Sequence, residues 1–598
     1  MTETPTRWNL DPLYTGPDDP AIDQDQREAA QRAETFRQDY RAVLKAETPG
    51  PDLLCRALDD YRSIHRLGLK PNFYVHLLFA RDSTRQDARK AMDRVRDRWN
   101  GISETILFFE LELLRLDEGA FSSLAGHSDL AEYAHYLHKL RAQSAYALEE
   151  NVEQALLRKD LSGKDAFTQL FEELTSSLLF TFHMPQEESP REVTGEELLG
   201  LLHHPDADVR RRALGTFLDK HGENALVLTS CFNNILLDHG KESDLRGYPD
   251  LMTPSLLENE TDRRMVDSLM TVTEENYGLA RDYFALKARL LGMGKLKNTD
   301  IYAPVGLQAD TLSFTEGRDL VLDAFGGFSS QMAQLAQAFF DEERIDAFPQ
   351  AGKTGGAFCM GMMPGLSPYV LLNYTGTMRD VATLAHELGH GIHFSLSQGQ
   401  NLFHYDAPLP MAETASVFGE MLLTRRLLEN HSDRRAKIAL LCARIEDIIA
   451  TTFRQNVLTR FEQEAHRRRG EGLLSSDALC GLWLEENGKL FGESVEMIEP
   501  YRWGWSYIGH FIHSRFYCYS YIFGELLVLA LYQRYLEEGN SFVPRYLELL
   551  KAGGSKAPQD LVAPFGIDLH NRSFWQTGYD LVRELYRELN VLVEAEGS

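Results

Sequence analysis

A His-Glu-x-x-His run constrains this chain more than any other feature. It consists of His386, Glu387 and His390, and it lies in a segment, 380–396, whose pattern predicts a helix. Because an α-helix turns once every 3.6 residues, the two histidines project from one face and can bind one zinc ion. Glu387 lies beside them, where it can act as a general base. The run therefore predicts a metallopeptidase.

The helix around this run has its own start signal and its own core face. Thr377 followed by Asp380 resembles a capping box, in which side chain and backbone of the first turn bond reciprocally. One face is apolar, through Val381, Leu384, Leu388 and Ile392. The alternative interpretation, a surface helix with two solvated histidines, explains this amphipathic pattern without any metal.

A catalytic zinc site needs a third protein ligand and an open position for water. Glu413 is the best candidate, in a second predicted helix that begins after Pro408 and Pro410. Glu420, seven residues later, can accept a hydrogen bond from a ligating imidazole and so fix its tautomer. The alternative is that both are ordinary helix carboxylates, although their apolar neighbours would make an unpaired carboxylate costly to bury.

His393 lies one turn beyond His390 on the predicted helix. Its position suits contact with a carboxylate or with substrate as well as it suits a metal bond, so we place it near the site without a fixed role. The longer metzincin pattern is excluded, because it requires glycine at position 393 and histidine at position 396, which is leucine here.

The combined pattern resembles the M3 family of zinc oligopeptidases, specifically the oligoendopeptidase F branch. Similar segments occur along nearly the whole chain, at residues 8–14, 246–259, 352–359, 368–374 and 510–521. The resemblance implies a mainly α body with a small β element beside the zinc helix, a deep substrate channel and one Zn²⁺ per chain. Gly509 and Arg515 depart from the family, which often has proline at these positions.

The resemblance also implies a role for the downstream histidine and tyrosine segment. His510, Tyr519 and Tyr517 are our candidates for donors that stabilise the oxyanion of the tetrahedral intermediate. The alternative is an aromatic core stripe, since Phe511, Phe516 and their aromatic neighbours recur at helical spacing.

A glycine-rich stretch precedes the predicted zinc helix. It is no phosphate-binding loop, because the Walker pattern requires glycine where this chain has Ala347. We expect a mobile loop over a cleft, with Gly355 and Gly356 contacting substrate. The following strand, Tyr369 to Tyr374, is expected to expose an edge that pairs with an extended peptide backbone.

Helical patterns dominate the rest of the chain, and no internal repeat is present. A polar, proline-bearing stretch at 184–190 suggests a boundary between an N-terminal helical domain, 1–190, and a catalytic zinc peptidase domain, 191–598. Apolar residues recur at three- and four-residue spacing around 24–45, 84–115, 128–141, 164–183, 205–240, 261–290, 432–468 and 515–538.

Charge and cysteine usage limit the possible partners and compartments. The chain has 62 basic and 89 acidic side chains, a net charge of −27, so nucleic acid and anionic membranes are poor partners. The six cysteines are scattered, the first residues lack the apolar core of a signal peptide, and no run reaches transmembrane length. We therefore expect a cytoplasmic protein, with its oligomeric state open.

These patterns together predict a zinc-dependent endopeptidase. It would hydrolyse internal bonds of short unstructured oligopeptides by zinc-activated water, with Glu387 as general base. One alternative is a zinc carboxypeptidase, which should require a positive group to hold the terminal carboxylate. The other is a non-catalytic peptide-binding protein, although the presence together of His386, Glu387, His390 and Glu413 argues against it.

Overall fold

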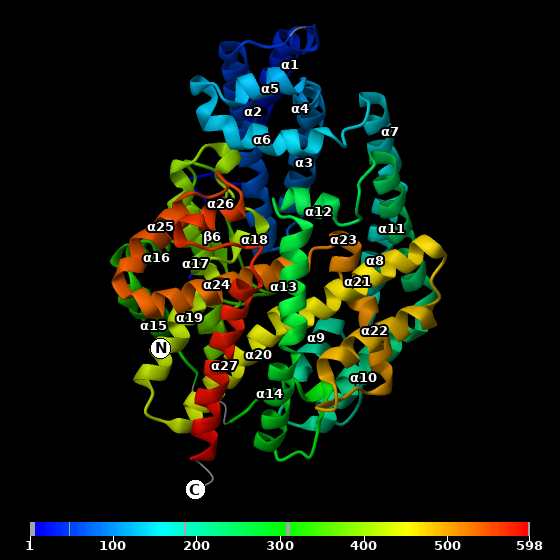
Figure 1. Cartoon of the computed structure of the whole chain (residues 1–598), viewed down its shortest axis with the longest axis vertical. Coiled ribbons are helices and arrows are strands. Elements are labelled where there is room, and N and C mark those ends of the chain that lie inside the picture. The colour runs from blue at the N-terminus through cyan, green and yellow to red at the C-terminus, as the bar shows by residue number, and fades with distance from the viewer. Residues whose placement is uncertain (1–5, 47, 185–186, 307–310, 596–598) are drawn as a thin grey trace. The chain divides into compact units, whose positions relative to one another are not determined.

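A computed structural model describes residues 6–46, 48–184, 187–306 and 311–595. Helices make up most of these residues, and the strands form three small sheets (Figure 1). The predicted mainly α class with a small β element is thereby confirmed. Among the described residues, no helix has both the length and the apolar character needed to span a membrane.

The chain divides into two compact units, each built from three segments. Unit 1 consists of residues 1–147, 309–427 and 534–567. Its helices are α1 (Pro20–Ala46), α2 (Pro51–Arg81), α3 (Gln86–Ile106), α4 (Phe108–Leu114), α5 (Glu118–Ala125), α6 (Ala134–Ser144), α15 (Phe314–Phe328), α16 (Ser330–Asp341), α17 (Met378–Leu396), α18 (Leu409–Ala412), α25 (Phe542–Lys551) and α26 (Pro558–Val562).

Unit 2 consists of residues 148–308, 428–533 and 568–598. Two further helices contribute residues to both units, α19 (Ser416–Asn430) and α24 (Tyr519–Glu538). The helices of unit 2 itself are α7 (Glu150–Asp160), α8 (Lys164–Ser177), α9 (Gly195–Gly200), α10 (Ala207–Glu223), α11 (Ala225–Arg246), α12 (Thr253–Glu258), α13 (Arg263–Glu275), α14 (Tyr277–Leu290), α20 (Arg434–Thr451), α21 (Phe453–Glu471), α22 (Ser476–Phe491), α23 (His510–His513) and α27 (Arg572–Glu594).

Unit 2 also contains two two-stranded sheets. β1 (Phe180–Phe182) pairs antiparallel with β2 (Arg191–Val193), and β3 (Leu296–Lys297) pairs parallel with β7 (Val495–Glu496). The proline-bearing stretch at 184–190 thus lies between two paired strands. The boundary at residue 190 stays a prediction, because compactness does not show which parts fold independently.

The three-stranded sheet of unit 1 precedes α17 in the chain. Its order is β4 (Ile345–Asp346), β6 (Tyr369–Leu371), β5 (Phe358–Met360), with β6 parallel to β4 and antiparallel to β5. Because β6 has a partner on both sides, the prediction of an exposed edge at Tyr369 to Tyr374 is wrong. The two edge strands of this sheet are β4 and β5.

The glycine-rich stretch is fastened to this sheet by a lysine. The ammonium group of Lys353 donates to the carboxylate of Asp346 at 2.6 Å and to the carbonyls of Asp346 and Phe348 at 3.1 and 2.8 Å. All three of its hydrogens therefore have acceptors. Lys353 closes the loop after β4, which explains a Gly-Lys-Thr sequence without any phosphate.

Candidate metal centre

The helix α17 positions the His-Glu-x-x-His run as the sequence predicts. Thr377 accepts from the backbone N–H of Asp380 at 3.2 Å, and Asp380 accepts from the backbone N–H of Thr377 at 3.0 Å, so the capping box is confirmed. The apolar face is fully buried, at Val381, Leu384, Leu388 and Ile392. Packing of this face fixes the direction in which the histidines project.

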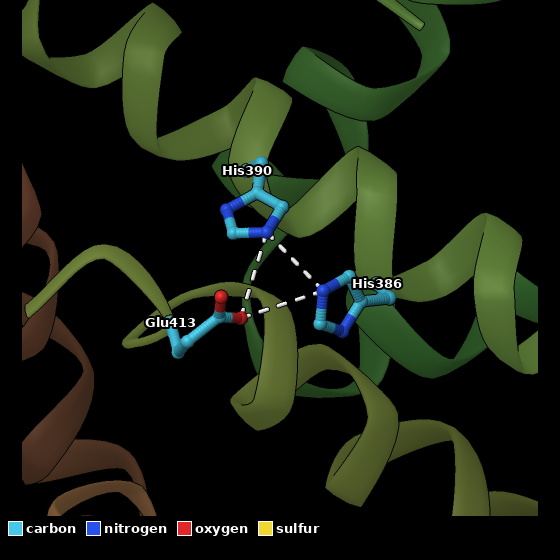
Figure 2. A group of neighbouring side chains, drawn as sticks. All are labelled: His386, His390 and Glu413. Carbon is cyan, nitrogen blue, oxygen red and sulfur yellow. Dashed lines mark hydrogen bonds and ion pairs between the residues drawn. The ribbon is translucent and has the colours of Figure 1, made fainter. Parts of the chain in front are cut away.

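Three candidate ligand atoms converge beside α17 (Figure 2). The Nε2 atoms of His386 and His390 lie 3.2 Å apart, and the Oε2 atom of Glu413 lies 3.4 and 3.5 Å from them. Ligands about 2.0–2.1 Å from a tetrahedral zinc ion are separated by about 3.3 Å. The three atoms thus have the spacing that one tetrahedral ion requires, and all three side chains are half-buried.

Glu413 lies at the C-terminal end of the short helix α18, before α19 begins at Ser416. The hydroxyl of Ser416 donates to Oε2 of Glu413 at 2.6 Å, which orients the carboxylate. Gly389 allows the close approach, because a Cβ atom there would lie 2.5 Å from the carbonyl oxygen of Ala415 and the Cα of Ser416. The third position between the histidines therefore has a packing reason to be glycine.

Hydrogen bonds fix the tautomers of both histidines. His386 donates from Nδ1 to Oε1 of Glu420 at 2.5 Å, as predicted for that carboxylate. His390 donates to the backbone carbonyl of Ala412, the residue before Glu413. In each ring the remaining nitrogen is Nε2, the atom near Glu413, and its lone pair is available to a metal.

The field at this centre favours positive charge. Burial opposes a charge on His386, but the hydrogen bond to Glu420 and the charges of Glu420 and Glu413 outweigh it and raise the pKa of His386 to about 10. Burial likewise opposes a charge on Glu413, yet the neighbouring histidines lower the pKa of its carboxyl group. A divalent cation satisfies the same demand for charge, so the donor set fits a metal ion.

Glu387 is buried beside the histidines, with 6% of its surface exposed. Burial raises the pKa of Glu387 to about 7, while the charge of His386 and a hydrogen bond from the backbone N–H of Cys359 in β5 act in the opposite direction. A carboxyl group whose pKa lies near neutrality can both accept and return a proton. No sequence pattern indicates that the backbone of Cys359 is its partner.

His393 lies next to the centre and outside the group of three ligand atoms. It is buried, and its ring donates to the carbonyl of Ala412, which His390 also uses. Burial and the charge of His390 lower the pKa of His393 to about 4, so the ring is neutral at pH 7. Its role as a supporting residue stays a prediction.

The predicted oxyanion donors belong to unit 2. His510 approaches the hydroxyl of Tyr521 through Nε2 at 3.1 Å and stacks on Tyr517, with ring centroids 5.3 Å apart. Tyr519 is fully buried, and its hydroxyl lies 3.0 Å from the side-chain amide nitrogen of Asn259. Tyr521 is the residue that sequence reasoning missed; it lies on α24, and its ring centroid is 5.2 Å from that of Tyr517, which precedes the helix.

The four predicted substrate-binding residues fall into two groups. Gly355 and Gly356 are exposed, and Asn373 donates to the carbonyl of Gly356 at 2.8 Å. Tyr369 and Tyr374 are buried, and their hydroxyls bond to backbone carbonyls of unit 1. Substrate contact by these four residues stays a prediction, and for the tyrosines it would have to use the backbone.

The His-Glu-x-x-His helix, together with a carboxylate as the third candidate ligand and a buried glutamate between the histidines in sequence, is typical of a metallopeptidase. The model of peptidase family M3 matches residues 329–581, and that of oligopeptidase F matches residues 112–180. The chain thus contains a peptidase family M3 domain, and its relatives indicate a metalloendopeptidase.

Known relatives agree with this assignment. The chain is 26% identical to an oligoendopeptidase F homolog of Lactococcus lactis, over 82% of each chain. A solved structure from Chlamydophila abortus, 23% identical, superimposes with a TM-score of 0.86 over 99% of both chains. Oligoendopeptidase-F from Enterococcus faecium, 21% identical, gives a TM-score of 0.74 over 96% of this chain and 99% of its own. These structures support the same fold.

Proposed function

We propose that this metalloendopeptidase hydrolyses internal peptide bonds of short unstructured oligopeptides, with one zinc ion per chain bound by His386, His390 and Glu413. The observation that carries the proposal is the spacing of 3.2 to 3.5 Å between the three ligand atoms, each with its lone pair directed by a hydrogen bond or by packing. The oligopeptide substrate class is supported by the matching oligopeptidase F model and by the names of the relatives.

Two nitrogens and one carboxylate oxygen suit zinc, and they also suit manganese or cobalt. When bound, zinc would supply Lewis acidity, which activates a water molecule and polarises the scissile carbonyl. Glu420 and Ser416 would hold their ligand partners in place through the contacts at 2.5 and 2.6 Å. Such supporting contacts raise metal affinity because the ligands need no reordering when the ion binds.

Glu387 would act as the general base and then as the general acid. Its carboxylate would take a proton from the attacking water and deliver it to the leaving amine. The hydrogen bond from the backbone N–H of Cys359 holds the carboxylate toward β5, on the edge strand of the sheet. We propose that the free side of β5, in place of β6, pairs with the substrate backbone.

His510, Tyr517 and Tyr521 are proposed as donors to the developing oxyanion, with Tyr519 as the weaker candidate. An imidazole N–H and two phenol O–H groups can each donate a hydrogen bond to the oxyanion. One such donor typically stabilises the transition state by about 3–4 kcal/mol in comparable enzymes. Burial, followed by the charges of Arg454 and His513, lowers the pKa of His510. We further propose a cytoplasmic location, because six scattered cysteines without a disulfide are typical of a reducing compartment.

The test uses internally quenched peptides with both ends blocked. We expect the purified protein to contain about one zinc ion per chain and to cut these peptides at internal bonds, which a carboxypeptidase cannot do. Glu387→Gln should retain the metal and lose about 100- to 10,000-fold in kcat. Wild-type turnover by Glu387→Gln with zinc bound would refute the assignment of the base.

A further inference from the structure

Cationic side chains buried in unit 2 are paired with carboxylates. Burying an unpaired charge is costly, so proteins provide a partner of opposite charge. The pairs are Arg210 with Asp300 at 2.7 Å, Arg444 with Glu525 at 2.7 Å and Lys287 with Glu446 at 2.5 Å.

Arg454 on α21 is half-buried and differs from these pairs. Its one hydrogen bond to a described residue goes to the hydroxyl of Tyr507 at a long 3.4 Å, and no carboxylate of the described residues forms an ion pair with it. The side chains that interact with its charge are Tyr507, Tyr302 and Tyr501, and none of them is a carboxylate. The guanidinium group is thus left with most of its five donors unused.

The side chain of Arg454 packs among tyrosines and remains partly exposed to solvent. Burial acts to lower the pKa of Arg454, but the neighbouring hydroxyls of Tyr507, Tyr302 and Tyr501 raise it above its ordinary value, and the side chain is half-buried. Two of its tyrosine neighbours, Tyr302 and Tyr507, are half-buried as well. A desolvated cation that solvent still reaches, without an internal counter-ion, is a group prepared for an external anion.

The planar guanidinium fork matches the two oxygens of a carboxylate, and the hydroxyl of Tyr507 adds a third donor. We propose that Arg454 and Tyr507 bind a carboxylate group of the peptide substrate, an inference that rests on the proposed oligopeptidase function. The charge of Arg454 also reaches His510, whose pKa it helps to lower, so this carboxylate site and the predicted oxyanion donors belong to one region of unit 2.

The carboxylate has two possible sources, the C-terminus of the peptide and an Asp or Glu side chain. Either one fixes the position of the peptide relative to the cut. Because the protein carries a net charge of −27, its surface in general repels anionic peptides, and a single site that attracts them should have a visible effect on selectivity.

The experiment compares peptides that differ only in this charge, using the full-length zinc enzyme. One pair has neutral side chains and ends in a free acid or an amide, and the second pair is amidated and carries Glu or Gln at each position in turn. We expect kcat/KM to favour the acid member of one pair about 10- to 100-fold. The preferred pair identifies the source, and the cut should stay at a fixed distance from the carboxylate as the peptide is lengthened.

Arg454→Met should remove the preference by lowering kcat/KM about 10- to 100-fold on the preferred acid and less than about 3-fold on its neutral partner. Tyr507→Phe should weaken the preference less. Arg460→Met is the matched control, because Arg460 also lies on α21 but pairs with Glu274 at 2.6 Å, and it should leave the preference intact. Equal losses on acid and neutral peptides in Arg454→Met, or a wild type that prefers neither, would overturn the proposal.

Two further measurements keep the outcome clear. If Arg454→Met fails to fold, Arg454→Lys takes its place with the same peptide pairs, and a preference that it retains in full overturns the role of the guanidinium fork. Binding of the acid and neutral peptides to Glu387→Gln, measured by fluorescence anisotropy, requires no turnover. A preference for the acid there supports the site even if the proposed peptidase function fails, and no preference overturns it.

Discussion

The metal centre of unit 1 and the histidine and tyrosine segment of unit 2 differ in what holds them in place. Two proposed ligands and the proposed general base lie within five residues of α17, and Glu413 lies at the C-terminal end of α18. The unit 2 segment depends on partners far away in sequence. Phe516, with a positive φ of 55°, is held by Glu462 of α21, which accepts from its backbone N–H at 2.8 Å, and by Ser255 of α12, which donates to its carbonyl at 2.9 Å.

This difference separates two kinds of information. Helical periodicity specifies that His386, Glu387 and His390 lie together on α17. In unit 2, a turn with positive φ and contacts between distant helices determine which tyrosine hydroxyls are hydrogen-bonded inside the protein. Changes in the first region should therefore alter metal content, and changes in the second should alter turnover or stability at constant metal content.

The largest expected effect is the loss of the third ligand. Glu413→Ala should reduce bound zinc from about one ion per chain to well below half and lower activity by at least about 1000-fold, because two imidazoles alone hold the ion weakly. Metal content after dialysis and cleavage of a quenched peptide measure both. The exposed Glu196 of α9 provides the control, Glu196→Ala, which should change neither. A Glu413→Ala protein with full zinc would disprove the ligand assignment.

Much of the metal centre could be predicted from sequence, since the capping box, the apolar face and the ligand spacing of α17 all repeat with the helix. Helix ends were less predictable. The periodic segments 205–240 and 261–290 are each two helices, interrupted at Asn224 and Asn276, whose side-chain amides donate to carbonyls four residues earlier. Such side-chain bonds compete with the backbone ladder and leave no trace in the hydrophobic pattern.

Other elements were missed for a related reason. The 31-residue helix α2 is absent from the predicted segments, and it contains Pro71, a residue that ordinarily ends a helix. Likewise, the short runs of β4, β5 and β6 cannot show which strand is central, because strand order depends on contacts between residues far apart in the chain. The sequence predicted the strand at Tyr369 and could not predict that it has partners on both sides.

A smaller effect is expected from the residue that orients His386. Glu420→Gln keeps a hydrogen-bond acceptor near Nδ1 and removes the charge, so zinc affinity should fall about 10- to 100-fold while a zinc-saturated enzyme remains active. Competition with a chelator of known affinity measures the change. Unchanged zinc affinity would mean that the contact of 2.5 Å between His386 and Glu420 only packs the two side chains and does not strengthen His386 as a ligand.

The tyrosines of unit 2 test the other side of the comparison. Tyr521→Phe removes the hydroxyl that meets His510, and kcat should fall about 10-fold or more at unchanged zinc content if it contributes to the oxyanion site. Tyr519→Phe removes a buried hydroxyl that lies 3.0 Å from Asn259 and 3.3 Å from Thr261. It should cost about 1–3 kcal/mol of stability and leave kcat nearly unchanged. The reverse pattern would return the catalytic role to Tyr519.

The last prediction concerns the pH dependence of the turn at Phe516, which should change stability and leave the metal centre unaffected. Burial raises the pKa of Glu462 to about 8, although the backbone N–H of Phe516 and the charge of Arg515 lower it, and its Oε2 atom has no partner among the described residues. In the unfolded chain a glutamate titrates at about 4.3, so between about pH 4.3 and pH 8 the folded protein binds one proton more than the unfolded chain. The stability that Glu462 contributes is therefore present below that window and is lost as pH rises through it.

The matched variant Glu462→Gln removes this titration and keeps an acceptor for the N–H of Phe516. From pH 5 to pH 7.5, the free energy of unfolding of the wild type should fall relative to Glu462→Gln by up to about 1.4 kcal/mol per pH unit. Urea unfolding of both proteins at several pH values measures this difference. A difference that stays constant with pH would show that Glu462 is ionised in the fold. The Phe516 turn would then be held by an ionised carboxylate, as His386 of the metal centre is.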